Sequence, residues 1–201
     1  MNRSLSASAA IVGPLLAGVG MSFGQTYAPD ALHPLFNSAA PVVAIAAAAA
    51  FAGRRLWQAM ALAAIAGPLV MVGYYGTAAL RGFGVSSTWV LFWCTAGVAV
   101  GAVMGLAVWL LRRDDDGRAP SLLRGLSVAV WPGVAFGEAA HGIVRVSDTT
   151  PIVYWWSEVA LAVLVLAVLC WRFARSAGGV ATAILAAAAI GGGMFFTYGA
   201  L

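Results

Sequence analysis

Both glutamates and both histidines of the chain are predicted to lie toward the same side of a lipid membrane. They are Glu138, Glu158, His33 and His141. Membrane proteins carry few ionisable side chains within the bilayer because burying them there is costly, and those that occur commonly serve a function. Glu138 and Glu158 stand in two apolar segments joined by a short loop. We therefore expect the two carboxylates at similar depths, about one to two helical turns below the outer surface.

Aromatic side chains accompany these carboxylates along the sequence. Trp131, Glu138 and His141 follow one another at intervals that place them on one face of a helix. Aromatic rings attract cations, and carboxylates supply charge and hydrogen-bond acceptors. We therefore expect an outward-facing pocket for a small cationic or heteroaromatic solute. Its candidate ligand-binding residues are Glu138, His141, Glu158, Trp131, Tyr154, Trp155, Tyr74, Arg145 and Asn37.

Two other interpretations of this cluster stay open. In the first, Glu138 pairs with His141 or Arg145 and locks its own helix, while Trp155 and Trp156 belong to the aromatic belt at the membrane interface. In the second, a metal ion is held by a set of four side chains, namely Glu138, His141, His33 and Glu158. The spacing of Glu138 and His141 matches that of di-iron helical bundles, but those bundles need a second such pair. We expect no metal and no cofactor.

The composition is that of a membrane protein. The chain has 201 residues, of which 62% are hydrophobic and 9% are charged, whereas a soluble domain has about 25% charged residues. All 11 basic residues are arginines, and the absence of lysine excludes a retinal Schiff base, which needs a lysine amine. The arginines stand in short loops without exposed aromatic partners, so nucleic-acid binding is not expected.

The apolar runs predict an all-α fold, a polytopic transmembrane helical bundle of about seven spans. The predicted spans cover residues 7–27, 35–52, 56–80, 88–111, 122–143, 152–171 and 178–200. The second is short and is expected to break at Pro41, so six spans and a re-entrant segment are the alternative. Nine arginines fall on one side of these spans and two, Arg81 and Arg145, on the other. The positive-inside rule then places the N-terminus in the cytoplasm and the C-terminus outside.

We treat residues 1–201 as a single integral membrane domain of the cell membrane, the inner or plasma membrane. Glycines spaced four apart, Gly97, Gly101 and Gly105 among them, form stripes that let helices pack closely. One stripe could instead dock a partner subunit. The largest cytoplasmic loop carries three consecutive aspartates at 114–116, which we interpret as part of a solvated linker because arginines flank them.

Three hypotheses about function follow, and none assigns a catalytic residue. The first is binding or transport of the solute described above, with a separate partner membrane subunit or ATPase supplying energy, since the chain has no nucleotide motif. The second is a non-catalytic accessory subunit of a larger membrane complex that docks through the glycine stripes. The third, an intramembrane enzyme acting on a lipid or quinone through Glu138 and His141, lacks a nucleophile motif and ranks last.

Several segments resemble an uncharacterised family of small polytopic membrane proteins from bacteria with GC-rich genomes. The similarity rests on residues 35–39, 72–75, 91–93, 131–133 and 137–138, and it extends over most of the chain. It implies that Asn37, Tyr74 and Glu138 stand in contexts typical of the family, and it carries no activity.

The chain also looks, more loosely, like the substrate-binding subunits of energy-coupling-factor vitamin transporters. That resemblance implies an outward pocket and docking onto a partner through small residues such as Gly13 to Ala17. It concerns architecture alone.

Overall fold

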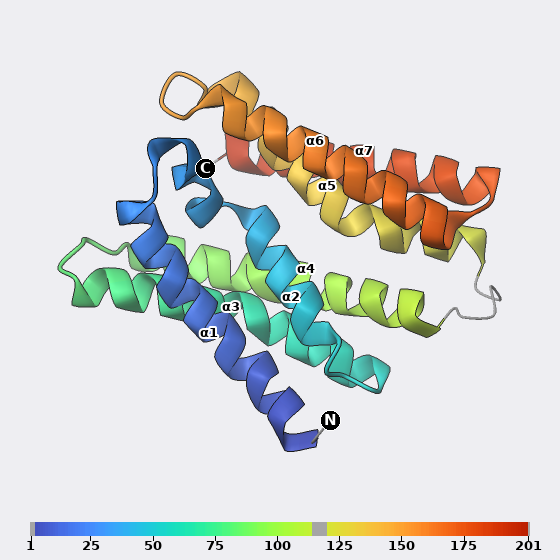
Figure 1. The fold of residues 1–201 in the computed structure, drawn as a ribbon, viewed down its shortest axis with the longest axis horizontal. Coiled ribbons are helices and arrows are strands. Elements are labelled where there is room, and N and C mark those ends of the chain that lie inside the picture. Colours follow the sequence, from blue (N-terminus) through green and yellow to red (C-terminus); the bar gives the residue numbers. More distant parts are fainter. Residues whose placement is uncertain (1–2, 114–119, 201) are drawn as a thin grey trace. The chain divides into compact units, whose positions relative to one another are not determined.

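The computed structural model describes residues 3–113 and 120–200, and all regular elements within them are helical, which confirms the predicted all-α class. The elements in chain order are α1 (Arg3–Tyr27), the 3₁₀ helix η1 (Asp30–Asn37), α2 (Ala39–Ala50), α3 (Leu56–Leu80), α4 (Ser87–Arg113), α5 (Ser121–Arg145), α6 (Ile152–Leu169), the π-helical turn η2 (Cys170–Ala174) and α7 (Ala177–Gly199) (Figure 1). The aspartate run at 114–116 lies outside the described residues.

Among the described residues, five helices are long and apolar enough to cross a membrane, and a sixth span results if η1 and α2 are counted together. The chain therefore has the helices of a membrane protein. The five are Ser8–Tyr27, Leu56–Leu80, Ser87–Arg113, Ile152–Ala174 and Ala177–Gly199. Helix α5 is not among them. It is the helix whose residues are most buried by other protein segments, and a helix surrounded by protein can carry Gly, Pro, Glu and His without exposing them to lipid.

The second predicted span is two helices rather than one. η1 and α2 are bent by 52° at Ser38, so the predicted continuous segment 35–52 is wrong at its start. The break does not occur at Pro41. That proline stands in the first turn of α2, where a residue without an N–H group is tolerated because the N–H groups there have no partner within the helix.

One compact unit of the chain comprises Met1–Pro29 and Pro41–Trp109. Within it α3 packs closely against α1, where a Cβ added at Gly73 would overlap the backbone of Leu15. On another side α3 packs against α4, with Gly67 facing Gly97 and Gly101 facing the backbone of Ala63. The glycine stripe of α4 is therefore occupied by α3. The predicted use of this stripe for docking a partner subunit is wrong for these residues.

This packing makes Gly101→Ala destabilising. The added methyl group would overlap the carbonyl oxygen of Ala63, and overpacking of this kind costs about 1–3 kcal/mol. Gly13→Ala is the matched control, because an added Cβ there meets nothing within 4 Å. We expect Gly101→Ala to lower the thermal unfolding temperature of the detergent-solubilised protein and Gly13→Ala to leave it unchanged or slightly higher. Equal behaviour of the two variants would contradict the α3–α4 packing.

The second compact unit comprises Asp30–Ala40 and Leu110–Leu201, and α5 packs in it against both α6 and α7 (Figure 1). Small residues let these helices approach. Gly133 and Gly137 of α5 face the backbone of α7, at Ala187 and Gly191 respectively. On α6, the indole of Trp155 lies directly over Gly142, where any side chain would overlap it. This close packing carries one face of α5, with Glu138, into the interior of the unit.

Candidate functional site

The carboxyl group of Glu138 in the second unit is buried and accepts three hydrogen bonds. It lies on α5 and is 4% exposed. Its Oε1 accepts a hydrogen bond from the backbone N–H of Ala39 at 2.8 Å, and its Oε2 accepts one from the N–H of Ala40 at 2.9 Å. The phenol of Tyr198 on α7 donates a third hydrogen bond to Oε1 at 2.8 Å. Three donors from two other segments therefore converge on one buried carboxyl group.

The start of α2 explains why a carboxylate sits there. The first N–H groups of a helix have no acceptor within the helix. In α2, Pro41 has no N–H at all, so the free donors of the first turn include Ala39 and Ala40, and Glu138 accepts from both. A negative charge at a helix N-terminus is also favoured by the helix dipole, by up to about 2 kcal/mol in partly buried sites. Glu138 therefore acts as a capping group supplied from a distant helix.

The carboxyl group of Glu158 on α6 is buried as well but, unlike that of Glu138, it lacks hydrogen-bond donors in the described part of the chain. It is 6% exposed, yet neither of its carboxyl oxygens has a hydrogen-bond donor among the described residues. Its carboxyl group lies close enough to that of Glu138 for the two groups to interact electrostatically, but no hydrogen bond joins them. A buried carboxylate without a donor or a counter-ion is strongly unfavourable, so Glu158 requires a proton, a cation or a donor from a ligand.

Hydroxyl groups and an indole complete the lining around the two carboxyl groups. The hydroxyls of Ser38 and Tyr154 are 3.0 Å apart and share a hydrogen bond. Trp131 donates from its indole Nε1 to the carbonyl oxygen of Ala40 at 2.9 Å. The segment 38–40 is thereby held by α5 and α6 together. Trp131, Tyr154, Glu138 and Glu158 were all predicted as site residues, and the structure brings these four together.

Trp155 is a core residue. It is 7% exposed, its indole Nε1 donates to the hydroxyl of Thr150 at 2.8 Å, and its ring covers Gly142. The alternative assignment of Trp155 to the interfacial aromatic belt is therefore wrong, because its indole is enclosed between α5 and α6. Its neighbour Trp156 is 57% exposed, as a residue at a membrane interface would be.

His141 and Arg145 turn toward α7. The imidazole of His141 lies 5.2 Å from the ring of Tyr198, centroid to centroid. The guanidinium of Arg145 lies 6.0 Å from the ring centre of Phe195. Within residues 3–113 and 120–200, neither side chain forms an ion pair with Glu138. The predicted pairing of Glu138 with His141 or Arg145 is therefore replaced by pairing with the start of α2.

Asn37 and Tyr74 are the two remaining predicted residues, and they belong to different units. Asn37 is the last residue of η1, and its side chain is exposed although Ser38 beside it is buried. Tyr74 belongs to the first unit, where its ring meets that of Tyr75 edge to face at 5.1 Å. No three His, Cys, Asp or Glu residues of the described chain are grouped so that they could hold a metal ion.

Sequence reasoning missed Ser38 and Tyr198. A serine followed by two alanines and a proline is a signal for a helix start, so the sequence contained an indication for Ser38. Tyr198 stands near the end of the last helix, on the side predicted for Glu138, but nothing in its neighbours marks it as a hydrogen-bond donor. Its role follows only from the packing of α7 on α5.

A family model described as "Family of unknown function (DUF6518)" matches residues 2–201. No curated protein and no solved structure matches the chain.

Proposed function

Because the chain belongs to this family of unknown function, we propose a function from the site itself. The protein binds a small cationic or hydrogen-bond-donating solute at the carboxyl pair of Glu138 and Glu158. The observation that carries this proposal is the buried carboxyl group of Glu158, which has no donor among the described residues. A ligand that brings a positive charge or an N–H group would supply what the group lacks.

The two glutamates have different tasks in this proposal. The carboxyl group of Glu138 already accepts three hydrogen bonds, so it orients the wall of the site and adds negative charge. Glu158 contacts the ligand directly. Tyr154 and Trp131 flank the pair and offer aromatic faces, which attract cations and stack on heteroaromatic rings.

The membrane topology proposed with this site has seven spans. Helix α5 counts as a span because its 25 residues extend over about 37 Å, enough for a hydrocarbon core of about 30 Å. η1 with α2 forms the bent second span. The nine arginines on one side then place the N-terminus in the cytoplasm and the carboxyl pair toward the outer side. The protein is accordingly a multi-pass protein of the cell membrane.

The accessory-subunit hypothesis retains support from α1 rather than from α4. Gly13 and Gly20 lie on one side of α1, and a Cβ added at either meets nothing within 4 Å. Leu16 between them is 61% exposed. Small residues on one side of a helix allow a second helix to approach closely, so α1 offers a face on which a partner membrane subunit could pack.

Native mass spectrometry of the protein gently extracted from its own membrane tests the proposed function. We expect the wild-type protein to retain a small molecule, and we expect Glu158→Gln to lose it. Asp148→Asn is the matched control, because it removes an exposed carboxylate from the loop between α5 and α6 and should retain the ligand. If Glu158→Gln binds the small molecule as the wild type does, or if a bound protein is found in its place, the solute-binding proposal fails.

A further inference from the structure

The junction between α6 and α7 has an unusual backbone. The end of α6 widens into the π-helical turn η2, closed by a hydrogen bond of 3.1 Å from the N–H of Arg175 to the carbonyl oxygen of Cys170. Arg175 has a φ of 20°. Among the described residues, no other residue apart from glycine has a positive φ. Single π turns and residues at strained φ occur frequently at functional sites. This observation alone assigns no ligand.

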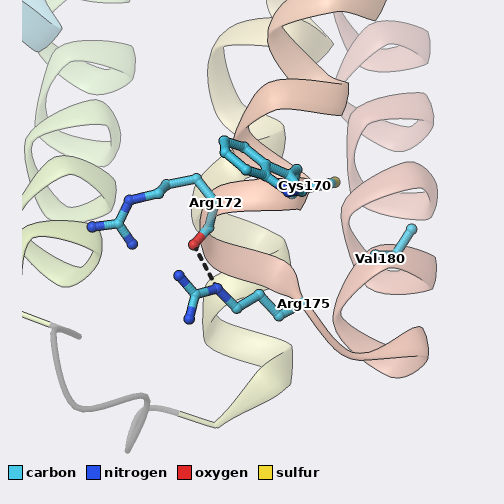
Figure 2. A pocket seen from close by; sticks show the side chains of 5 residues that line it. Cys170, Arg172, Arg175 and Val180 are labelled. Carbon is cyan, nitrogen blue, oxygen red and sulfur yellow. Dashed lines mark hydrogen bonds between the residues drawn. The ribbon is translucent and has the colours of Figure 1, made fainter.

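A hollow of about 480 Å³ opens at this junction. Its lining residues are Cys170, Trp171, Arg172, Arg175 and Val180. Figure 2 shows the guanidinium groups of Arg172 and Arg175 extending to the same side of the π turn. Arg175 is held there by a hydrogen bond of 3.0 Å from its Nε to the carbonyl oxygen of Arg172. The guanidinium of Arg172 lies 4.9 Å from the ring centre of Phe173. Two positively charged residues therefore line the open volume.

Arg172 and Arg175 give this hollow a positive charge. Within the described residues, no carboxylate forms an ion pair with Arg172 or Arg175. The first turn of α7, which begins at Ala177, adds the positive end of a helix dipole. Guanidinium groups match the geometry of phosphate oxygens and bind them with paired hydrogen bonds. The site is therefore suited to a phosphate-bearing anion.

The position of Trp171 distinguishes a lipid from a soluble anion. Its side chain is 79% exposed and stands at the end of the apolar segment Ile152–Ala174. Exposed tryptophans at the ends of membrane-spanning segments lie at the level of the lipid headgroups. We propose that the hollow at the α6–α7 junction binds the phosphate-bearing headgroup of an anionic lipid, with Arg172 and Arg175 contacting the phosphate.

Lipid binding to the purified, delipidated full-length protein tests this proposal. Phosphatidylglycerol is titrated and counted by native mass spectrometry, with phosphatidylcholine as the neutral lipid. We expect Arg172→Gln to weaken binding of one phosphatidylglycerol by about fivefold, the effect of one basic residue at a charged membrane surface. Arg175→Gly should weaken it as much while preserving the fold, since a glycine without Cβ adopts a positive φ with less strain than arginine.

Arg54→Gln is the matched control, because Arg54 is exposed, falls on the same predicted side of the membrane and changes the net charge equally. It should bind phosphatidylglycerol as the wild type does. If all three variants bind it equally, or if phosphatidylcholine binds as tightly, the proposal is overturned. A separate titration with inorganic phosphate identifies the source of the anion. Binding of inorganic phosphate as tight as that of the lipid, and equally sensitive to Arg172→Gln, would overturn the lipid assignment in favour of a soluble phosphate compound.

Discussion

Glu138→Gln is expected to destabilise the protein by about 3 kcal/mol, the upper end of the cost of leaving one buried donor without an acceptor. The glutamine amide keeps one acceptor oxygen and replaces the other with an NH₂ group. That group would face the N–H of either Ala39 or Ala40, and two donors cannot pair. The loss of stability would therefore be concentrated at the start of α2.

Two measurements together check this expectation. Chemical or thermal unfolding in detergent gives the change in the free energy of unfolding. Hydrogen exchange of a peptide covering residues 36–41 reports local opening at the start of α2, where we expect faster exchange in the variant. Tyr198→Phe provides the graded comparison. It removes one of the three donors to Glu138 and leaves both backbone contacts, so it should cost only about 1 kcal/mol. A Glu138→Gln protein with wild-type stability and unchanged exchange would show that the carboxyl group does not hold this segment.

Glu158→Leu is expected to stabilise the protein, in contrast to Glu138→Gln. Its carboxyl group is buried without a donor, and burying a polar group without a hydrogen bond costs about 1–3 kcal/mol, which an apolar side chain of similar volume avoids. The same change removes the group that we propose contacts the solute. The variant should therefore unfold at a higher temperature than the wild type and fail to bind the ligand.

This combination separates a functional group from a structural one. A residue kept for stability cannot be replaced with a gain in stability, whereas a binding residue can. The double variant Glu138→Gln/Glu158→Leu gives a further check. Because the two carboxyl groups lie beside each other, their effects on unfolding should not add. A Glu158→Leu protein that is less stable than the wild type would indicate that Glu158 has a donor in the folded protein and would remove the basis of the proposed site.

Much of the local structure followed from the sequence. The predicted segment 56–80 has the same ends as α3, and the predicted segment 122–143 differs from α5 by one residue at its start and two at its end. Apolar runs bounded by charged or turn residues define helix ends locally, since each helix forms its backbone hydrogen bonds within itself. The exception was the segment 35–52, which is bent by 52° between η1 and α2, because Glu138 of a distant helix accepts from the N–H groups that begin α2.

The membrane character, the helices and the presence of two glutamates in neighbouring apolar segments were determined by the sequence alone. Only the tertiary structure decided which of the two glutamates accepts hydrogen bonds from other segments of the chain. The partners of Glu138 are 60 to 99 residues away along the chain, and two of them are backbone N–H groups of alanines, which no side-chain pattern can reveal. A helix terminus must find acceptors wherever the packing supplies them. Packing brought the start of α2 to Glu138 and left Glu158 without a donor.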